Sequence, residues 1–218
     1  MRLALRNQLR RKSQVDVALL QDEIVDIMYR LVPSAVFHGG TAIWRCLQAN
    51  RFSEDLDFYA IVEPSFRVDL EAETRARELQ LTRFRKTPAT VFSNISDGQT
   101  VVSLEIALRQ KKDFIACPFE RTDGTAMNVF SLSREQFIIE KMSACSNRRL
   151  IRDWYDLFFL TSTPFELETV LPFVAAFTQK ALPPLDEKNL STLVFSGAVP
   201  SFRQMSETIR RRLSHEIH

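Results

Sequence analysis

Apolar residues recur at helical spacing early in the chain and alternate with polar ones soon afterwards. Residues 14–31 (QVDVALLQDEIVDIMYRL) carry apolar side chains every three or four positions and precede Pro33, which predicts an amphipathic helix. A short apolar run at 35–37 leads to a second helical pattern at 41–48, for which Thr41 can serve as N-cap. The alternation at 55–62 (DLDFYAIV) then predicts a strand with Leu56 and Phe58 directed toward the core.

The middle of the chain combines one helical segment with three strands. Residues 67–81 are charged and favour a helix. Two alternating segments, 90–95 and 100–108, flank Asp97-Gly98, which is a strong signal for a β-hairpin. A short strand at 128–132 ends before Ser133, where the sequence S-R-E-Q predicts a capping box between Ser133 and Gln136.

The last third of the chain has a helical pattern. The helix that begins near Ser133 carries Lys141, a break is expected near residues 146–147, and a further helix covers 151–160. From Pro164 onward the pattern stays helical and is punctuated by prolines. We therefore predict an α+β protein in which a mixed sheet flanked by helices (residues 1–132) is followed by a helical C-terminal lobe (residues 133–218).

Composition narrows the class of protein. With 218 residues, 45% of them hydrophobic and 26% charged, the chain can bury one good-sized core and is neither disordered nor a coiled coil. No apolar run approaches the roughly 18 residues of a membrane span, and the N-terminus lacks the features of a signal peptide. Its three cysteines are far apart, which argues for a cytoplasmic protein without a disulfide framework or zinc site.

Positive charge is gathered in short clusters although the net charge is only +2. Each cluster alone is explained by a solvated helix face, whereas together they are compatible with a polyanionic partner. Both interpretations stay open at this point. The clusters are Arg10-Arg11-Lys12, Arg83/Arg85/Lys86, Lys111-Lys112, Arg148-Arg149/Arg152 and Arg210-Arg211-Arg212.

Two glycines and two aspartates stand out in FHGGTAIWRCLQANRFSEDLDFYA (37–60), because the chain has only five glycines. On a strand, Asp55 and Asp57 share a face, and two neighbouring carboxylates are typical ligands of a hard cation such as Mg²⁺. Gly39 and Gly40 precede the predicted helix, where backbone N–H groups can approach a phosphate closely. Together these pairs predict a triphosphate–metal pocket, whereas the D-x-D pair alone is more typical of a solvated strand face with two incidental acids.

Glu105 is a third acidic candidate. It lies in VVSLEIAL, where Val102, Leu104 and Ile106 alternate with Ser103 and Glu105. An acid within so apolar a strand is costly unless it is paired or coordinated. Glu105 is therefore a candidate third metal ligand or general base, and an exposed polar strand face is the alternative.

The motif G-G-T-A followed by a hydrophobic residue (39–43), together with R-x-S-x-D-L-D-F (51–58), resembles the AbiEii/AbiGii-type nucleotidyltransferases. These are minimal members of the DNA polymerase β-like superfamily, and they include toxins of abortive-infection and toxin–antitoxin systems such as the MenT group. A second family pattern matches E-K-M-S-A (140–144) and R-L-I-R-D-W-Y-D-L (149–157). The two motifs frame residues 35–160.

The resemblance implies transfer of a nucleoside monophosphate from an NTP, with Mg²⁺ or Mn²⁺ as cofactor. Asp55 and Asp57 match the family's metal ligands, and Arg51 matches a position that contacts phosphate or instead braces the turn. The family's triphosphate-lining positions fall on Gly39, Gly40, Thr41 and Ser53.

The second motif implies roles for three more residues. Lys141 matches the lysine that reaches the triphosphate. Asp153 matches an acid that acts as a base or holds Lys141 or Arg149, and Asp156 is expected to be a structural ion-pair partner.

Three classes of function follow from this resemblance. The first is a toxin that transfers NMP to RNA, with the 3′ end of tRNA as acceptor and a cognate antitoxin as partner. The second keeps the enzyme and changes the acceptor to a protein side chain (AMPylation) or a small molecule. The third is a non-catalytic nucleotide-binding partner, against which the intact Asp55, Asp57 and Lys141 argue.

Overall fold

The computed structural model describes residues 3–214, which form two compact units. The first unit comprises the chain up to Gln48 together with Phe52–Ser131. The second comprises Ala49–Arg51 and the chain from Leu132 onward. The chain therefore passes from the first unit to the second and back within three residues, before it reaches Asp55.

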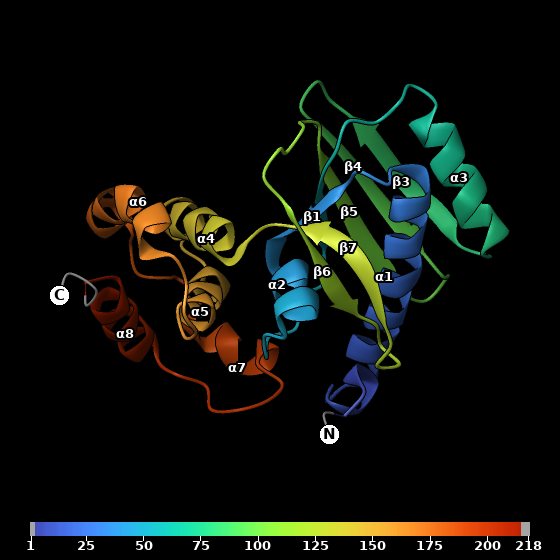
Figure 1. Cartoon of the computed structure of the whole chain (residues 1–218). Coiled ribbons are helices and arrows are strands. Elements are labelled where there is room, and N and C mark those ends of the chain that lie inside the picture. The colour runs from blue at the N-terminus through green and yellow to red at the C-terminus, as the bar shows by residue number, and fades with distance from the viewer. Residues whose placement is uncertain (1–2, 215–218) are drawn as a thin grey trace. The chain divides into compact units, whose positions relative to one another are not determined.

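A seven-stranded mixed sheet forms the centre of the first unit (Figure 1). Its spatial order is β3-β4-β5-β2-β1-β7-β6. The pairs β2/β5 and β1/β7 are parallel, and the remaining neighbours are antiparallel. The strands are β1 (Val36–His38), β2 (Leu56–Tyr59), β3 (Gln80–Lys86), β4 (Thr90–Ser96), β5 (Val101–Ala107), β6 (Ile115–Glu120) and β7 (Ala126–Ser131).

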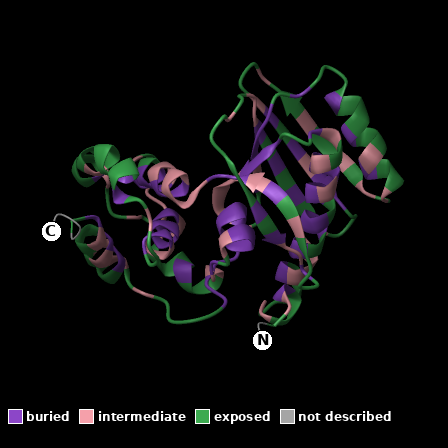
Figure 2. Cartoon of the chain, in the orientation of Figure 1, coloured by how far each residue is buried: buried purple, intermediate pink, exposed green. Residues whose placement is uncertain are grey.

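Three helices pack against this sheet and bury its apolar face. They are α1 (Lys12–Leu31), α2 (Gly39–Leu47) and α3 (Phe66–Ala76), preceded by the short 3₁₀ helix η1 (Leu5–Asn7). Helix α1 contacts β5, α2 contacts β2 and β6, and α3 contacts β3. Phe37 and Phe58 stack at the centre of the core with their ring centroids 4.9 Å apart. Buried and exposed residues alternate along the strands (Figure 2), so the opposite sheet face carries polar side chains.

The second unit is helical. Its elements are α4 (Arg134–Arg148), α5 (Ile151–Leu160), α6 (Leu167–Lys180), η2 (Glu187–Asn189), α7 (Leu190–Leu193) and α8 (Phe202–Ser214). Ser133 and Gln136 form the predicted capping box of α4, with each side chain bonded to the backbone of the other residue. Helix α4 ends at Arg148, and its C-cap residue Arg149 has a φ of 52°, in the left-handed region.

The α+β prediction is confirmed, as are the first helix, the Asp97-Gly98 hairpin and the capping box. The helix predicted at 67–81 is wrong in its second half, because the chain leaves α3 at Ala76 and enters β3 at Gln80. Strand β6 was not predicted. The two strands that were missed, β3 and β6, are the edge strands of the sheet. Side chains of an edge strand need not alternate between core and solvent.

Candidate active site

A pocket of about 400 Å³ opens on the polar face of the sheet. Asp55, Asp57 and Glu105 line it together, from the start of β2 and the middle of β5. Asp57 pairs in register with Glu105 on one side and with His38 of β1 on the other. The structure therefore brings the three predicted acids to one place, where Asp55 and Glu105 are exposed and Asp57 is half-buried.

The turn from β1 into α2 requires a glycine. Gly39 has a φ of +77°, in the left-handed region that side-chain-bearing residues rarely adopt. A Cβ atom at this position would also lie 2.8 Å from Cγ of Asp57, well inside van der Waals contact. The missing side chain thus lets the Asp57 carboxylate lie directly against the first residue of α2, with Gly40 next in the helix.

Thr41 does not cap α2, so this prediction is wrong. The helix begins two residues earlier, at Gly39, and His38 is the N-cap residue. The Thr41 side chain is fully buried, and its hydroxyl donates a hydrogen bond of 2.5 Å to the carbonyl oxygen of Asp55. In this structure Thr41 holds the backbone of the loop that leads into β2.

The same loop is held from α1. The side-chain amide of Gln21 is fully buried and donates to the carbonyl oxygens of Ser53 (3.0 Å) and Glu54 (2.9 Å). Together with the bond from Thr41, this leaves three consecutive carbonyl groups fixed by two buried side chains. Asp55 is the third of these residues, so the bonds set the position at which the acidic strand starts.

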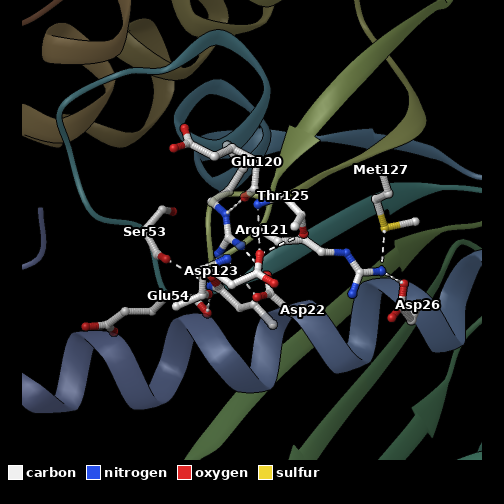
Figure 3. A network of polar contacts seen from close by, with 12 residues as sticks. Asp22, Asp26, Ser53, Glu54, Glu120, Arg121, Asp123, Thr125 and Met127 are labelled. Carbon is white, nitrogen blue, oxygen red and sulfur yellow. Dashed lines mark hydrogen bonds and ion pairs between the residues drawn. The ribbon is translucent and has the colours of Figure 1, made fainter. Parts of the chain in front are cut away.

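A buried arginine, Arg45, is hydrogen-bonded to Gln21. Arg45 of α2 donates to Oε1 of Gln21 (3.3 Å) and to the carbonyl oxygen of Glu120 (2.6 Å), and it forms an ion pair with Asp22. Burial lowers the pKa of Arg45, and the Asp22 carboxylate opposes that effect. Figure 3 shows this network, with Asp22 and Asp26 projecting from α1 and the loop residues Ser53 and Glu54 beside that helix.

The three acids fit a divalent metal ion by their donor chemistry, because hard cations take carboxylate oxygens. Within residues 3–214 the side chains do not already form a group of three metal-ligating residues. Neighbouring strands lie about 4.8 Å apart, so the carboxylates of Asp57 and Glu105 can converge by side-chain rotation alone. Asp55 and Asp57 would hold the ion, with Glu105 either as a third ligand or as the base that activates the attacking hydroxyl.

In the second unit, the charged residues of the second motif form a buried cluster. Nζ of Lys141 lies 2.9 Å from Oδ1 of Asp153 and 2.7 Å from Oδ2 of Asp156. The guanidinium of Arg51 donates to both Asp156 oxygens at 2.8 Å. All four residues are at most 7% exposed, so Lys141 is not a solvated surface lysine.

Mutual attraction favours the charged forms of Lys141 and Asp156. Burial lowers the pKa of Lys141, but Asp156 and Asp153 raise that pKa by more, and it ends above its ordinary value. Burial raises the pKa of Asp156, but Arg51 and then Lys141 lower it by more, and it ends below its ordinary value. The cluster therefore joins α4, α5 and residues 49–51 by charge-assisted hydrogen bonds.

The contacts of Arg51 and Asp156 are those of residues with a structural role. Arg51 also forms an isolated β-bridge with Val194, so both its backbone and its side chain are bound within the second unit. Of the two roles considered for Arg51, bracing the chain agrees with these contacts. Asp153 differs from Asp156, because its Oδ2 accepts no hydrogen bond from the described part of the chain and lies 3.9 Å from Nε of Arg148.

Comparison with known proteins decides the family. Residues 26–211 match the family described as nucleotidyl transferase AbiEii toxin of type IV toxin–antitoxin systems. The chain belongs to the AbiEii family. It is thus a nucleotidyltransferase toxin, and the family implies an NTP substrate and an antitoxin partner.

Solved structures agree on the fold. The nucleotidyltransferase toxin MenT4 of Mycobacterium tuberculosis H37Rv is 18% identical, with a TM-score of 0.64 over 94% of this chain and 85% of that one. JHP933 of Helicobacter pylori is 17% identical, with a TM-score of 0.63 over 94% of this chain and 92% of that one. The predicted polymerase β-like fold is therefore confirmed. A search of curated proteins finds no significant match.

Across residues 3–214 of this AbiEii protein, no helix has both the length and the hydropathy to cross a membrane.

Sequence reasoning missed Gln21 and Arg45. Gln21 lies between the buried residues Ala18 and Ile24 on the apolar face of α1, and a polar residue on such a face was the available signal. Arg45 is a charged residue within the short, mostly apolar α2. The folded structure was needed to show which backbone groups these side chains bind.

We predict that Gln21→Met impairs nucleotide transfer by the AbiEii protein more than it impairs folding. Methionine preserves the volume of glutamine but leaves the Ser53 and Glu54 carbonyls without their donor, which costs about 1–3 kcal/mol. Displacement of Asp55 should lower kcat by about tenfold or more, since small misplacements in an active site cost up to about 100-fold. Thermal unfolding and steady-state kinetics measure the two effects.

Gln14→Met is the matched control for this variant. Gln14 is a second buried glutamine on α1, and its Oε1 has no hydrogen-bond partner among residues 3–214. We expect its kcat to stay near the wild-type value. Equal kcat in wild type and Gln21→Met would show that the loop needs no such support.

We further predict that Asp156→Asn lowers the free energy of unfolding by roughly 3 kcal/mol or more, because it leaves buried cations undercompensated. The pKa of Asp156 is lowered by folding, so its contribution is present above the unfolded value of about 3.9 and is lost as pH falls through the folded value. The difference between wild type and Asp156→Asn should be constant from about pH 7 to 5 and shrink below about pH 4. Urea unfolding across this range tests it, and a difference that grows toward low pH would contradict it.

Proposed function

We propose that this AbiEii protein is a metal-dependent enzyme that transfers NMP from an NTP to RNA, with the 3′ end of tRNA as acceptor. The observation that carries the proposal is the single pocket that Asp55, Asp57 and Glu105 line, beside the glycine turn that opens α2. Paired carboxylates beside a helix N-terminus are the donor set that a metal–triphosphate requires.

The triphosphate is proposed to lie over Gly39 and Gly40. The nine-residue helix α2 directs its free N–H groups and its positive end toward that position. Asp57 lies against Gly39, so phosphate and metal ligands are immediate neighbours. Ser53 is half-buried in the loop before the strand and is proposed to line the same triphosphate, whereas Thr41 supports the loop through its bond to Asp55.

The proposed reaction is an in-line displacement at the α-phosphorus of the NTP. An acceptor hydroxyl oxygen forms the new P–O bond, the bond to the bridging oxygen breaks, and pyrophosphate leaves with the electron pair. Glu105 faces the pocket and takes the proton of the hydroxyl. Asp55 and Asp57 would hold Mg²⁺ or Mn²⁺, which would supply charge stabilisation to the reacting phosphate.

Lys141 is proposed to bind phosphate through a donor that its cluster in the second unit leaves unused, with Asp153 as its positioning residue. An ammonium group has three N–H donors, and the two aspartates engage Lys141 without exhausting them. Asp153 also keeps one carboxylate oxygen without a hydrogen bond among the described residues, so it can follow a change in the position of Lys141. Asp156, bound to two cations, stays structural.

The RNA acceptor is supported by the basic clusters of the chain and by Arg83 and Arg85, two exposed arginines that line the pocket. Phosphate contacts of this kind are strongly salt-dependent. A protein side chain or a small molecule as acceptor, and a non-catalytic nucleotide-binding role, are the competing outcomes of the experiment that follows.

We predict that the purified protein transfers label from one α-labelled NTP to total tRNA when Mg²⁺ is present. Asp55→Ala/Asp57→Ala should abolish transfer while retaining the melting temperature to within a few degrees, since Asp55 is exposed and Asp57 half-buried. Lys141→Ala should raise KM for the NTP, but it also opens the buried cluster, so its melting temperature must be measured beside its kinetics.

Glu63→Ala/Asp69→Ala removes the same charge from exposed positions of the same unit and should transfer normally. Label on protein in place of tRNA would move the acceptor to a side chain. No transfer and no binding of Mg²⁺–NTP would remove the enzymatic proposal.

A further inference from the structure

Beyond the three acids, the pocket continues across the sheet to its edge. A single row of residues in register runs over four neighbouring strands: Asp57 of β2, Glu105 of β5, Phe92 of β4 and Arg85 of β3. Arg83 lies two residues from Arg85 and also lines the pocket. The pocket is therefore acidic at the centre of the sheet and basic at its edge.

The two arginines of this edge are free to bind a ligand. Arg83 and Arg85 are exposed, and within residues 3–214 neither guanidinium forms a hydrogen bond or an ion pair with another residue. Two residues along a strand span about 6.8 Å, so the two side chains can contact successive groups of one extended ligand. Arginine binds phosphate through two parallel hydrogen bonds, which makes such a pair suited to a polyanionic chain.

Phe92 separates the arginines from Glu105. Its side chain is 37% exposed on the polar face of the sheet and lines the pocket. Charged residues on an edge strand also protect a sheet from aggregation, but an exposed aromatic ring beside them does not serve that purpose. An aromatic ring beside phosphate-binding side chains is instead the arrangement on which proteins stack nucleic-acid bases.

The direction of the reaction assigns this end of the pocket to the acceptor. In an in-line displacement, the attacking hydroxyl and the leaving pyrophosphate lie on opposite sides of the α-phosphorus. The triphosphate is proposed to lie on the β1 side of Asp57, at Gly39. The attacking strand then approaches from the β5 side, where Glu105, Phe92 and Arg85 follow one another.

We infer that Arg83, Arg85 and Phe92 form the binding site for the single-stranded 3′ end of the acceptor RNA. Phe92 stacks on a base close to the terminal nucleotide, and the two arginines bind phosphates further along the strand. This inference rests on the proposed transfer to RNA and adds the part of the pocket that selects a single strand.

The test measures binding of a short 5′-labelled single-stranded RNA by fluorescence anisotropy, without NTP, over a range of salt concentrations. Arg83→Ala/Arg85→Ala should weaken binding by about tenfold or more and reduce the slope of log K against log salt by about 1.4, at about 0.7 for each lost phosphate contact. Phe92→Ala should weaken RNA binding at least several-fold. Phe92→Trp should bind RNA about as tightly as the wild type, whereas Phe92→Leu should bind as weakly as Phe92→Ala.

Two controls separate this inference from general effects of charge. Arg6→Ala/Arg75→Ala removes two positive charges from exposed positions of the same unit and should leave the RNA affinity and the salt slope unchanged. Binding of Mg²⁺–NTP, measured by calorimetry, should be the same in wild type and in Arg83→Ala/Arg85→Ala. Loss of NTP binding in that variant would assign the arginines to the donor and overturn the inference.

The same preparations are assayed for transfer of label to tRNA. In one outcome, the wild type labels tRNA while Arg83→Ala/Arg85→Ala and Phe92→Ala bind RNA with wild-type affinity. The RNA-binding site then lies elsewhere, and the proposed function stands. If the wild type labels no RNA, the proposed acceptor is wrong and this inference falls with it.

Discussion

The close approach of the Asp57 carboxylate to the backbone of Gly39 is the constraint on which the rest of the pocket depends. It needs a residue without a Cβ atom and with a φ of +77°, and glycine meets both requirements. Because β1 and β2 are paired at this point, the contact brings the free N–H groups of α2 beside the acidic strand. The paired glycines and the paired aspartates of the sequence are thus two parts of one structure.

Buried polar side chains fix the backbone of the loop that leads into β2. Gln21 and Thr41 hold three consecutive carbonyl groups before β2, and Arg45 links Gln21 to the backbone of β6. A buried polar network of this kind is costly to disturb, because each orphaned group would remain away from water. In the second unit, the ion pairs around Lys141 have the same effect on α4, α5 and residues 49–51.

Local signals in the sequence predicted much of this fold and part of the site. The Asp97-Gly98 turn, the Ser133 capping box and the helical period of α1 depend on neighbouring residues, and they were predicted correctly. Strand β3 and strand β6 were missed because they are edge strands, one rich in exposed polar residues and the other containing Pro118. The start of α2 was misplaced because a glycine turn, not Thr41, begins the helix. The contacts of Gln21 and Arg51 join residues 32 and 105 positions apart, and no local pattern contains such information.

The central claim is that the carboxylates beside Gly39 bind a divalent metal together with an NTP. Electron paramagnetic resonance of Mn²⁺, titrated with protein and a non-hydrolysable NTP, tests this claim without any acceptor. We predict that the wild type and Glu63→Gln/Asp69→Asn, which changes two exposed acids outside the pocket, remove the signal of free Mn²⁺ in proportion to the added protein, and that Asp55→Asn/Asp57→Asn does not. Equal loss of the signal with Asp55→Asn/Asp57→Asn would contradict the account and would require another metal-binding site.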